Sequence, residues 1–259
     1  MSAGAEMMER SEALPQSLRL GGRLLEGEAD FRRALETAGE AERPVLEFCL
    51  RWCGPDPELT IHTSGSTGAP KPIRVRKSCM VASARMTVRR LGLAAGDEAL
   101  LCLPMDYIAG QMMVVRAMTA GLELVAVPPS RHPLADRDHA PAFLAVVPLQ
   151  AKAMLSDPGE RRLFEATREI IIGGAAVDAD LAIPLKSFPH RVWSTYGMTE
   201  TLSHVALRPL SGPRAGVWYE PLEGVRAWAS ERGTLSLSAP AVGAPRIETN
   251  DMVAFDAEK

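Results

Sequence analysis

The sequence predicts an α/β fold: a mostly parallel sheet covered by helices on both faces, followed by a small antiparallel β subdomain. Short, nearly continuous apolar runs, such as residues 98–102 and 143–147, alternate with longer segments of helical periodicity. Strands of a parallel sheet are nearly continuously apolar because helices bury both faces of the sheet. After residue 203 the pattern changes to short strands separated by turns, which is typical of antiparallel structure.

The N-terminal part of the chain is expected to be helical. Residues 1 to about 17 are polar and are expected to be frayed. Helical periodicity marks residues 30–38 and 43–52, and Asp30 suits an N-cap. We therefore assign residues 1–58 to an N-terminal helical segment.

Residues 59–203 alternate strands with helices and form the predicted α/β core. The expected strands are residues 59–63, 73–76, 98–102, 122–127, 143–147, 170–172 and 192–194. The expected helices are residues 78–91, 110–120, 149–155, 160–167 and 178–185.

Residues 204–259 are expected to form the β subdomain. Its expected strands are residues 204–207, 217–219, 226–229, 233–238 and 252–255. Turn residues separate these runs, which favours hairpin connections within an antiparallel sheet.

The composition is that of a globular chain. With 259 residues and 46% apolar residues, the chain can bury a large core. A net charge of −3 gives no reason to expect nucleic acid or an anionic membrane as a partner. The basic cluster Arg74, Arg76 and Lys77 is interpreted as a solvated hairpin face, and Arg85 and Arg89 as an exposed helix face. No apolar stretch is long enough to span a bilayer, so a cytoplasmic location is expected.

The four cysteines lack the spacing of a zinc site or a disulfide framework. They are Cys49, Cys53, Cys79 and Cys102. We interpret them as reduced core residues.

Residues 63–71, with the sequence TSGSTGAPK, combine hydroxyl side chains, two glycines and a lysine. Glycines let backbone N–H groups converge on an oxyanion, hydroxyls add donors, and lysine adds a positive charge for phosphate. The segment differs from a P-loop because it lacks the Gly-Lys-Ser/Thr ending and an apolar–charged alternation follows it. We interpret it as a hairpin connection that binds a polyphosphate; an ordinary polar hairpin tip is the alternative. The residues assigned to phosphate binding are Thr63, Ser64, Gly65, Ser66, Thr67, Gly68 and Lys71.

A second segment, residues 196–201 with the sequence YGMTET, follows a short apolar run that predicts a buried strand. The ring of Tyr196 can stack on a base, Thr199 can hydrogen-bond a phosphate, and Glu200 can bind Mg²⁺. Alone, this hexapeptide is a weak signal.

Together with the glycine-rich loop, the hexapeptide resembles the acyl-adenylate-forming superfamily of acyl- and aryl-CoA ligases, luciferases and peptide-synthetase adenylation domains. Two further segments fit in the same order. Residues 171–176 are similar to the strand and turn that lie against adenine, which implies nucleotide contacts for Gly174 and Ala175. Residues 249–251 are similar to the tripeptide whose aspartate, here Asp251, binds the ribose hydroxyls. The resemblance implies the large N-terminal domain of the adenylate-forming fold.

The chain departs from this family at both ends. Only 62 residues precede Thr63, where the family has a longer segment, and the sequence stops eight residues past Asp251. The small C-terminal domain, which supplies a lysine to the adenylation step in this family, has no counterpart. We expect a truncated chain with low activity on its own.

The segment 103–116 occupies the position where the family lines its acyl pocket. Its Gly110 and Gln111, followed by Arg116, resemble the o-succinylbenzoate–CoA ligases of menaquinone biosynthesis. This resemblance implies substrate contacts for Tyr107, Gly110, Gln111 and Arg116. The substrate o-succinylbenzoate has two carboxylates, so one can be activated while an arginine fork anchors the other.

Two of these residues, and also His204, keep a second interpretation. Arg116 is either a carboxylate anchor or a helix arginine that reaches solvent. Tyr107 is a pocket wall or a core residue, at a position where many family members have histidine. His204 either faces the acyl pocket or is a structural histidine.

The resemblance implies a two-step acid–thiol ligase that uses ATP and Mg²⁺ and takes coenzyme A as co-substrate. The catalytic residues that it implies are Thr199, Glu200 and Lys71, with Glu200 holding the metal. The alternatives are another aryl- or acyl-CoA ligase and a non-catalytic adenylate-binding module. The expected partners are a small carboxylic acid, ATP and CoA, and the sequence is compatible with a homodimer.

The phosphate-loop assignment predicts that Lys71→Ala weakens ATP binding. Loss of one hydrogen bond from a charged donor should cost about 1.5–3 kcal/mol. Calorimetric titration with ATP and Mg²⁺ measures this difference. Unchanged affinity in the variant would remove Lys71 from the site.

Overall fold

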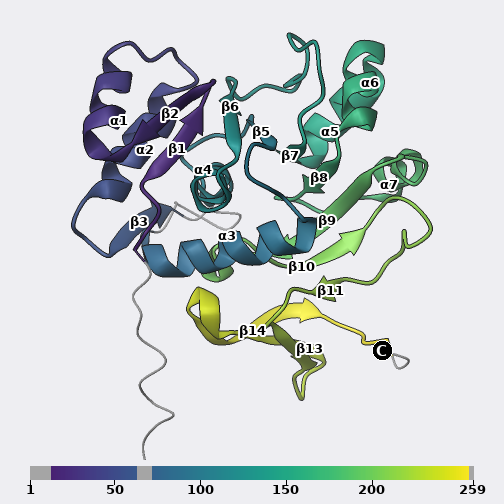
Figure 1. The fold of residues 1–259 in the computed structure, drawn as a ribbon. Coiled ribbons are helices and arrows are strands. Elements are labelled where there is room, and N and C mark those ends of the chain that lie inside the picture. Colours follow the sequence, from purple (N-terminus) through teal and green to yellow (C-terminus); the bar gives the residue numbers. More distant parts are fainter. Residues whose placement is uncertain (1–12, 63–71, 257–259) are drawn as a thin grey trace, which may run out of the picture.

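The computed structural model describes residues 13–62 and 72–256 (Figure 1). Its centre is a nine-stranded sheet with strand order β11-β10-β9-β8-β7-β5-β6-β1-β2. These strands are β1 Ser17–Leu20, β2 Arg23–Glu26, β5 Glu98–Leu101, β6 Glu123–Ala126, β7 Phe143–Val146, β8 Glu169–Ile172, β9 Arg191–Gly197, β10 His204–Pro209 and β11 Glu220–Pro221. The six central strands, in the order β9-β8-β7-β5-β6-β1, are parallel to one another. At the two edges, β2 pairs antiparallel with β1, β10 with β9, and β11 with β10.

Helices cover both faces of this sheet (Figure 1). They are α1 Gly27–Glu36, α2 Arg43–Cys53, α3 Lys77–Leu91, α4 Ile108–Ala120, α5 Pro148–Ser156, α6 Pro158–Ala166 and α7 Ala179–Leu185. Side chains alternate along each strand. In β5, Leu101 therefore joins a core with α1 to α4, whereas Leu100 packs in a second core with α5 to α7. The predicted α/β class with a mostly parallel sheet is confirmed.

Two smaller antiparallel sheets complete the described part. One contains β12 Arg226–Ala229, β13 Thr234–Ala239 and β14 Ala244–Met252. The other is the hairpin of β3 Glu58–His62 and β4 Pro72–Arg76, in which His62 pairs with Pro72. The predicted hairpin is thus confirmed, while its connection, residues 63–71, lies outside the described residues.

The N-terminal segment is not only helical as expected. Helices α1 and α2 are present, but β1 and β2 form a hairpin that joins the large sheet through parallel pairing of β1 with β6. Each strand has only four residues, and the turn uses Gly21 and Gly22 with φ of 56° and 77°. An isolated hairpin of this size is marginal, so its stability comes from a distant partner that local periodicity does not reveal.

The C-terminal assignment also needs correction. Strand β10, expected in the β subdomain, pairs with β9 and belongs to the large sheet. The strand expected at residues 217–219 is absent, and the two-residue β11 follows it instead. The strand expected at residues 252–255 is also wrong, since β14 ends at Met252. Sheet membership depends on long-range pairing, which the short alternating runs do not specify.

The hairpin cations divide into two environments. Arg74 and Arg76 are exposed as expected, and Arg74 pairs with Glu58 at 2.7 Å. Lys77 is not a solvated residue: it is buried at the start of α3 and donates to the Gly54 carbonyl at 2.7 Å. Burial lowers the pKa of the Lys77 ammonium. The interpretation failed because Lys77, grouped with Arg74 and Arg76 by its charge, is the first residue of α3.

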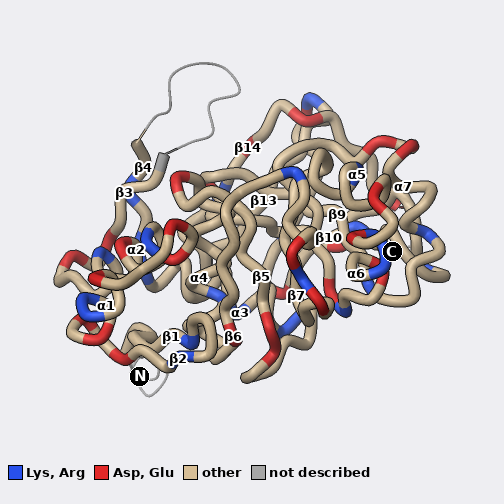
Figure 2. The backbone as a smooth tube through the Cα atoms, turned by 90° about the horizontal axis from the view of Figure 1, so that it is seen from above, with Lys and Arg blue, Asp and Glu red and all other residues tan. Residues whose placement is uncertain are grey.

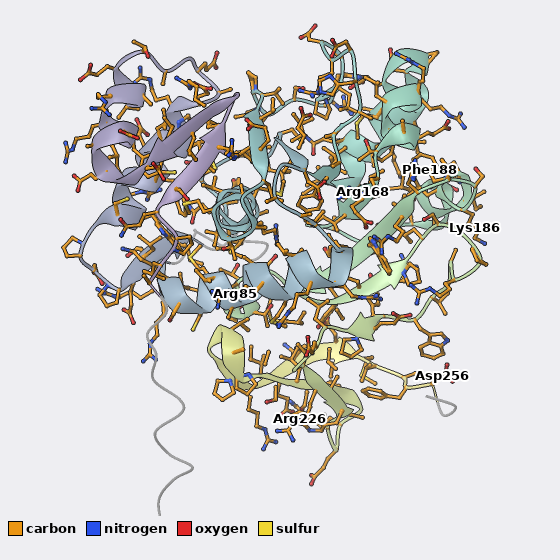
Figure 3. The ribbon with its side chains drawn as sticks, viewed as in Figure 1. Arg85, Arg168, Lys186, Phe188, Arg226 and Asp256 are labelled. Carbon is orange, nitrogen blue, oxygen red and sulfur yellow. The ribbon has the colours of Figure 1, made fainter. Side chains whose placement is uncertain are left out.

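Basic and acidic residues are interspersed along the chain (Figure 2). Arg85 and Arg89 are exposed on α3 as expected, and Figure 3 shows Arg85 on this helix. Within residues 13–62 and 72–256, no helix is long and apolar enough to cross a membrane. The cysteines of the described chain are free, and burial raises the pKa of the Cys102 thiol to about 12.

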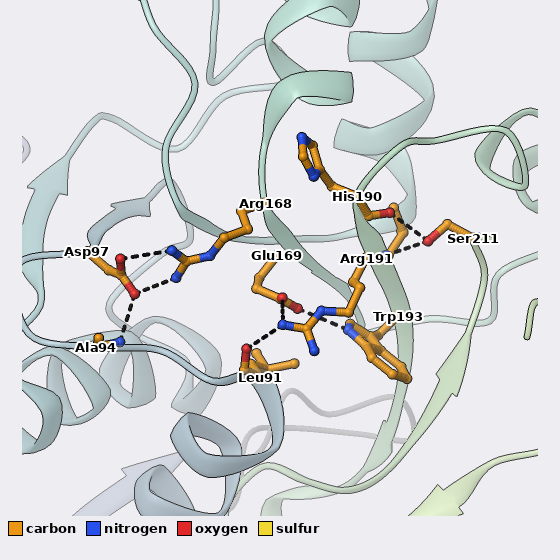
Figure 4. Close-up of polar contacts among 10 residues, drawn as sticks. Leu91, Ala94, Asp97, Arg168, Glu169, His190, Arg191, Trp193 and Ser211 are labelled. Atoms are coloured by element: carbon orange, nitrogen blue, oxygen red, sulfur yellow. Dashed lines mark hydrogen bonds and ion pairs between the residues drawn. The ribbon is translucent and has the colours of Figure 1, made fainter.

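A polar cluster connects strands β8 and β9 with the end of α3 (Figure 4). The buried Glu169 accepts a hydrogen bond from Trp193 Nε1 at 3.2 Å and pairs with Arg191, and burial raises the pKa of the Glu169 carboxyl. Arg191 also donates to the Leu91 carbonyl at 2.9 Å.

Beside this cluster, Asp97 lies between two donors (Figure 4). Its carboxylate accepts from Arg168 Nη1 at 3.0 Å and from the Ala94 backbone N–H at 2.7 Å. The hydrogen bond from Arg168 is the main reason that the pKa of Asp97 lies below its ordinary value. The pair therefore joins the loop before β5 to the start of β8.

We predict that Asp97→Asn lowers the free energy of unfolding by about 1–2 kcal/mol at neutral pH, since solvent around Arg168 weakens the pair. The folded-state pKa of Asp97 lies below the unfolded value. The contribution is therefore present above about pH 4 and is lost as the pH falls through the folded-state pKa. Urea unfolding of both proteins at neutral and acid pH measures this. A difference that stays constant on acidification would contradict the assignment.

Candidate active site

A pocket of about 340 Å³ lies at the carboxyl ends of the parallel strands. Leu103 follows β5, Val146 ends β7, Gly173 follows β8 and Thr195 belongs to β9; all four line the pocket. The carboxyl ends of parallel strands meet at one edge of a sheet, which is where ligands bind in open α/β folds. The topology therefore brings together segments that are distant in sequence.

Two glycines allow the pocket walls to approach each other. A Cβ atom at Gly173 would lie 2.3 Å from Thr195 Oγ1, and one at Gly197 would lie 2.2 Å from the Ser203 carbonyl oxygen. Both distances are shorter than any real contact, so a larger residue would displace β9 or the turn that follows it.

This turn contains the 3₁₀ helix η1, Thr199–Thr201, between β9 and β10. Thr201 Oγ1 accepts from the Met198 N–H at 3.0 Å and lies 2.7 Å from the Ser203 carbonyl oxygen. Leu202 has φ of 63°, a left-handed conformation that is unfavourable for leucine. The tight turn brings Thr199 to the pocket wall.

The neighbouring Glu200 is exposed. No ion pair or hydrogen bond to its carboxylate is present within the described residues. Over the same ranges, no group of three or more His, Cys, Asp or Glu residues could hold a metal ion by itself. A cation at this place would therefore need ligand oxygens in addition to Glu200.

Tyr196 and Asp251, two of the predicted nucleotide residues, meet across 55 positions of sequence. The Tyr196 hydroxyl donates to Asp251 Oδ2 at 2.6 Å and joins β9 to β14. Burial, and after it Asp251, raises the pKa of Tyr196. The ring also lies edge-on to Tyr219 with 6.0 Å between centroids.

The predicted adenine turn lies at the same edge of the sheet. Gly174 lines the pocket with φ of 81°, and Ala175 is exposed directly after it. The structure thus places Gly174, Thr199 and the flanks of Tyr196 around one cavity. Lys71 and the other predicted phosphate residues fall in the segment that is not described.

Arg116 is fully buried in α4 and lines the pocket, so it does not reach solvent. Its Nη2 donates to Ser203 Oγ at 2.7 Å, Nη1 lies 3.7 Å from Met113 Sδ, and Nε has no partner. No carboxylate pairs with this guanidinium in the described part of the chain. Burial lowers the pKa of Arg116 to about 10, which still leaves it charged at neutral pH.

The other predicted substrate residues have different positions. Tyr107 is exposed and lines the pocket. Gly110 and Gln111 lie behind the pocket wall: a Cβ at Gly110 would lie 2.4 Å from the Pro104 carbonyl oxygen, and Gln111 Nε2 donates to the Met105 carbonyl at 3.0 Å. They hold the loop that carries Tyr107.

Sequence reasoning missed Ser203 and left His204 undecided. Both line the pocket, and His204 is buried. Ser203 Oγ lies 3.3 Å from His204 Nδ1, and His204 Nε2 lies 3.1 Å from Thr87 Oγ1. Burial, with Arg116 as a second cause, holds the pKa of His204 well below its ordinary value. Their position directly after the hexapeptide was the available signal.

Comparison with known proteins identifies the family. The family described as "AMP-binding enzyme" matches residues 9–226, which is most of the chain. This chain therefore belongs to the AMP-binding enzyme family and is related to its acyl-CoA synthetases. The 2-succinylbenzoate–CoA ligase of Salmonella typhimurium is 27% identical over 226 residues, which cover 82% of this chain and 47% of that ligase. The chain spans about half the length of this curated relative.

Solved structures support the fold. The acyl-CoA synthetase (AMP-forming)/AMP-acid ligase II-like protein from Dyadobacter fermentans is 38% identical, with a TM-score of 0.81 over 89% of this chain and 66% of that one. The N-terminal domain of FACL13 from Mycobacterium tuberculosis superimposes with a TM-score of 0.64 over 82% of this chain and 64% of that one; at 19% identity it shows the fold alone. The expected large N-terminal domain of the adenylate-forming fold is confirmed.

Because His204 is buried, we predict that the free energy of unfolding decreases as the pH falls below about 6.5. Its folded-state pKa lies below the unfolded value of about 6.5, so only the unfolded state gains a proton as the pH falls below that value. The free energy of unfolding should fall by up to about 1.4 kcal/mol per pH unit. Urea unfolding between about pH 7.5 and pH 5.5 measures it, with His204→Gln as the comparison. An equal slope in both proteins would show that His204 does not contribute.

Proposed function

We propose that this member of the AMP-binding enzyme family is an ATP-dependent acid–CoA ligase whose acid carries a second carboxylate, as o-succinylbenzoate does. The observation that carries the proposal is Arg116, a buried guanidinium on the pocket wall without a carboxylate partner in the described chain.

A buried charge is expensive unless an opposite charge or a set of hydrogen bonds compensates it. Arg116 donates one hydrogen bond to the hydroxyl of Ser203 and makes one weak contact with the sulfur of Met113. Its buried Nε–H has no partner, so the charge is incompletely compensated, and the planar guanidinium matches a carboxylate better than it matches a neutral group. The largely apolar remainder of the pocket, including Leu103 and Ile171, suits an aromatic ring.

The nucleotide is proposed to bind along the sheet edge beside this pocket. The half-buried Tyr196 presents a ring for stacking on adenine, with Gly174 and Ala175 on the other side. Asp251 uses Oδ2 for Tyr196, so Oδ1 is left to accept from ribose hydroxyls. Thr199 reaches the pocket from its turn and would donate to the α-phosphate.

In the proposed first step, a carboxylate oxygen of the acid attacks the α-phosphorus of ATP and pyrophosphate leaves. In the second, the CoA thiol attacks the acyl carbon, and AMP leaves as the thioester forms. The chain contributes position and charge compensation: Arg116 fixes the acid by its other carboxylate, and Thr199 orients the phosphate.

Phosphate-bound Mg²⁺ would neutralise charge on the triphosphate. The exposed Glu200 fits such an ion, because Mg²⁺ is commonly held by one or two carboxylates plus substrate phosphates. Lys71 and the rest of the glycine-rich loop are proposed to bind the β- and γ-phosphates, and CoA is proposed as the acyl acceptor.

The substrate assignment predicts that Arg116→Ala weakens binding of a non-hydrolysable o-succinylbenzoyl-adenylate analogue but leaves AMP binding nearly unchanged. Loss of one partner of a buried charge pair typically costs about 2–5 kcal/mol, which corresponds to tens-fold to thousands-fold in affinity. Calorimetric titration of both proteins with both ligands measures this, and Arg89→Ala on the exposed face of α3 is the matched control.

Equal losses for the analogue and AMP would mean that the variant damages the site as a whole. No loss for either ligand would reject o-succinylbenzoate and leave another aryl- or acyl-CoA ligase as the alternative. Analogue binding without any ATP–pyrophosphate exchange would favour a non-catalytic adenylate-binding module.

A further inference from the structure

We infer that Ser203, His204 and Thr87 form a hydrogen-bonded chain that positions Arg116 for the second carboxylate of the substrate and so determines selectivity for acids that carry one. The inference rests on the proposed function and deepens it, because it assigns residues outside the predicted acyl segment to substrate choice.

This series of hydrogen bonds connects three elements of the fold: α4, β10 and α3. Arg116 on α4 donates to Ser203 Oγ at 2.7 Å, just before β10. Ser203 Oγ lies 3.3 Å from His204 Nδ1, at the first position of β10. His204 Nε2 lies 3.1 Å from Thr87 Oγ1 on α3, and Thr87 Oγ1 donates to the Ser83 carbonyl at 3.3 Å. The two helices thus hold opposite ends of one network.

The chemistry at the two ends fixes the direction of every hydrogen bond between them. A guanidinium can only donate, and a backbone carbonyl can only accept. Ser203 Oγ must therefore accept from Arg116, which leaves its hydroxyl proton for His204 Nδ1. His204 then carries its proton on Nε2 and donates to Thr87, whose hydroxyl proton points to the Ser83 carbonyl.

Only the neutral Nε2–H tautomer of His204 satisfies this order. A protonated His204 would present Nδ1–H to Ser203 and would place a second buried cation beside Arg116. The low pKa of His204 agrees with this arrangement. Arg116 is thereby the cation of the network, and its compensating anion has to come from the pocket.

The network also restricts the orientation of the guanidinium. With Nη2 held by Ser203, Nη1 has only the weak contact to Met113 and the buried Nε has no partner, so the charge is left for an anion in the pocket. A guanidinium whose orientation is set before binding loses less conformational freedom when a carboxylate arrives. Thr87 is fully buried and does not line the pocket, so it is a positioning residue that acts through its neighbours.

Two substitutions of His204 separate positioning from simple packing. Asparagine places a carbonyl oxygen near the position of Nδ1 and keeps the acceptor for Ser203. Glutamine places its amide NH₂ near the position of Nε2 and keeps only the donor to Thr87. A merely structural histidine has no reason to prefer one over the other in substrate choice.

The experiment measures affinity for two non-hydrolysable acyl-adenylate analogues, the o-succinylbenzoyl compound and a benzoyl compound without the second carboxylate. The ratio of the two affinities is the selectivity. We expect Ser203→Ala, which removes a hydrogen bond from the charged Arg116, to lower it about tenfold, and His204→Gln, which releases Ser203, to lower it in the same direction. Thr87→Val and His204→Asn each break only the outer link to Thr87, so both should lower it less and in the same direction, whereas Thr87→Ser should stay near wild type. Ser236→Ala, at a buried serine of β13 without a side-chain partner in the described chain, is the control.

Equal weakening of both analogues would overturn the inference, since the variants would then only loosen the pocket. Equal selectivity in the Gln and Asn variants would overturn it as well. If wild type shows no preference for the o-succinylbenzoyl analogue, the proposed function itself fails; a wild-type preference that all variants keep defeats this inference alone. Wild-type AMP affinity in a variant shows that the variant is folded. If a His204 variant does not fold, the comparison of Thr87→Val with Thr87→Ser tests the inference instead.

Discussion

The candidate site depends on how closely β9 approaches the chain that returns as β10. At Gly197 the backbone of Ser203 leaves no room for a Cβ atom, and Leu202 adopts a left-handed conformation to close the turn. This tight return places Thr199 on one wall of the pocket and Ser203 on another. A wider turn would separate the group expected to meet phosphate from the group that holds Arg116. The geometry of one turn thus relates the nucleotide half of the site to the acid half.

The second constraint is the buried charge itself. Most buried arginines in proteins are matched by carboxylates, and the cost of an unmatched one has to be offset elsewhere in the fold. Here Ser203 accepts a hydrogen bond from the guanidinium, and His204 and Thr87 extend this neutral network, which orders the guanidinium without neutralising it. The pocket therefore retains a positive potential in apolar surroundings, where an electrostatic interaction is stronger than in water.

The sequence allowed prediction of the class of fold, and its contiguous motifs supplied candidate site residues that the structure places at one edge of the sheet. Tyr196, Thr199 and Gly174 could be proposed because they belong to short contiguous motifs near the carboxyl ends of expected parallel strands, which meet at one edge of the sheet. The Tyr196–Asp251 contact, the edge hairpin of β1 and β2, and the contact of Thr87 with His204 were not identifiable, because each joins positions that local periodicity does not relate. Lys77 was misplaced because it was grouped with the exposed Arg74 and Arg76, whereas it begins α3 and is buried. Pairing between distant segments is decided by packing of the whole chain.

Both edges of the large sheet are closed by antiparallel strands that make poor templates for another chain. Strand β11 has two residues, one of them Pro221, which has no N–H to offer, and β2 has four residues bounded by Arg23 and Glu26. Short, charged or proline-containing edges discourage the addition of a strand from a neighbouring molecule. The long parallel interior, which assembles through distant contacts and is vulnerable to aggregation while it forms, is therefore shielded from self-association once these edges are in place.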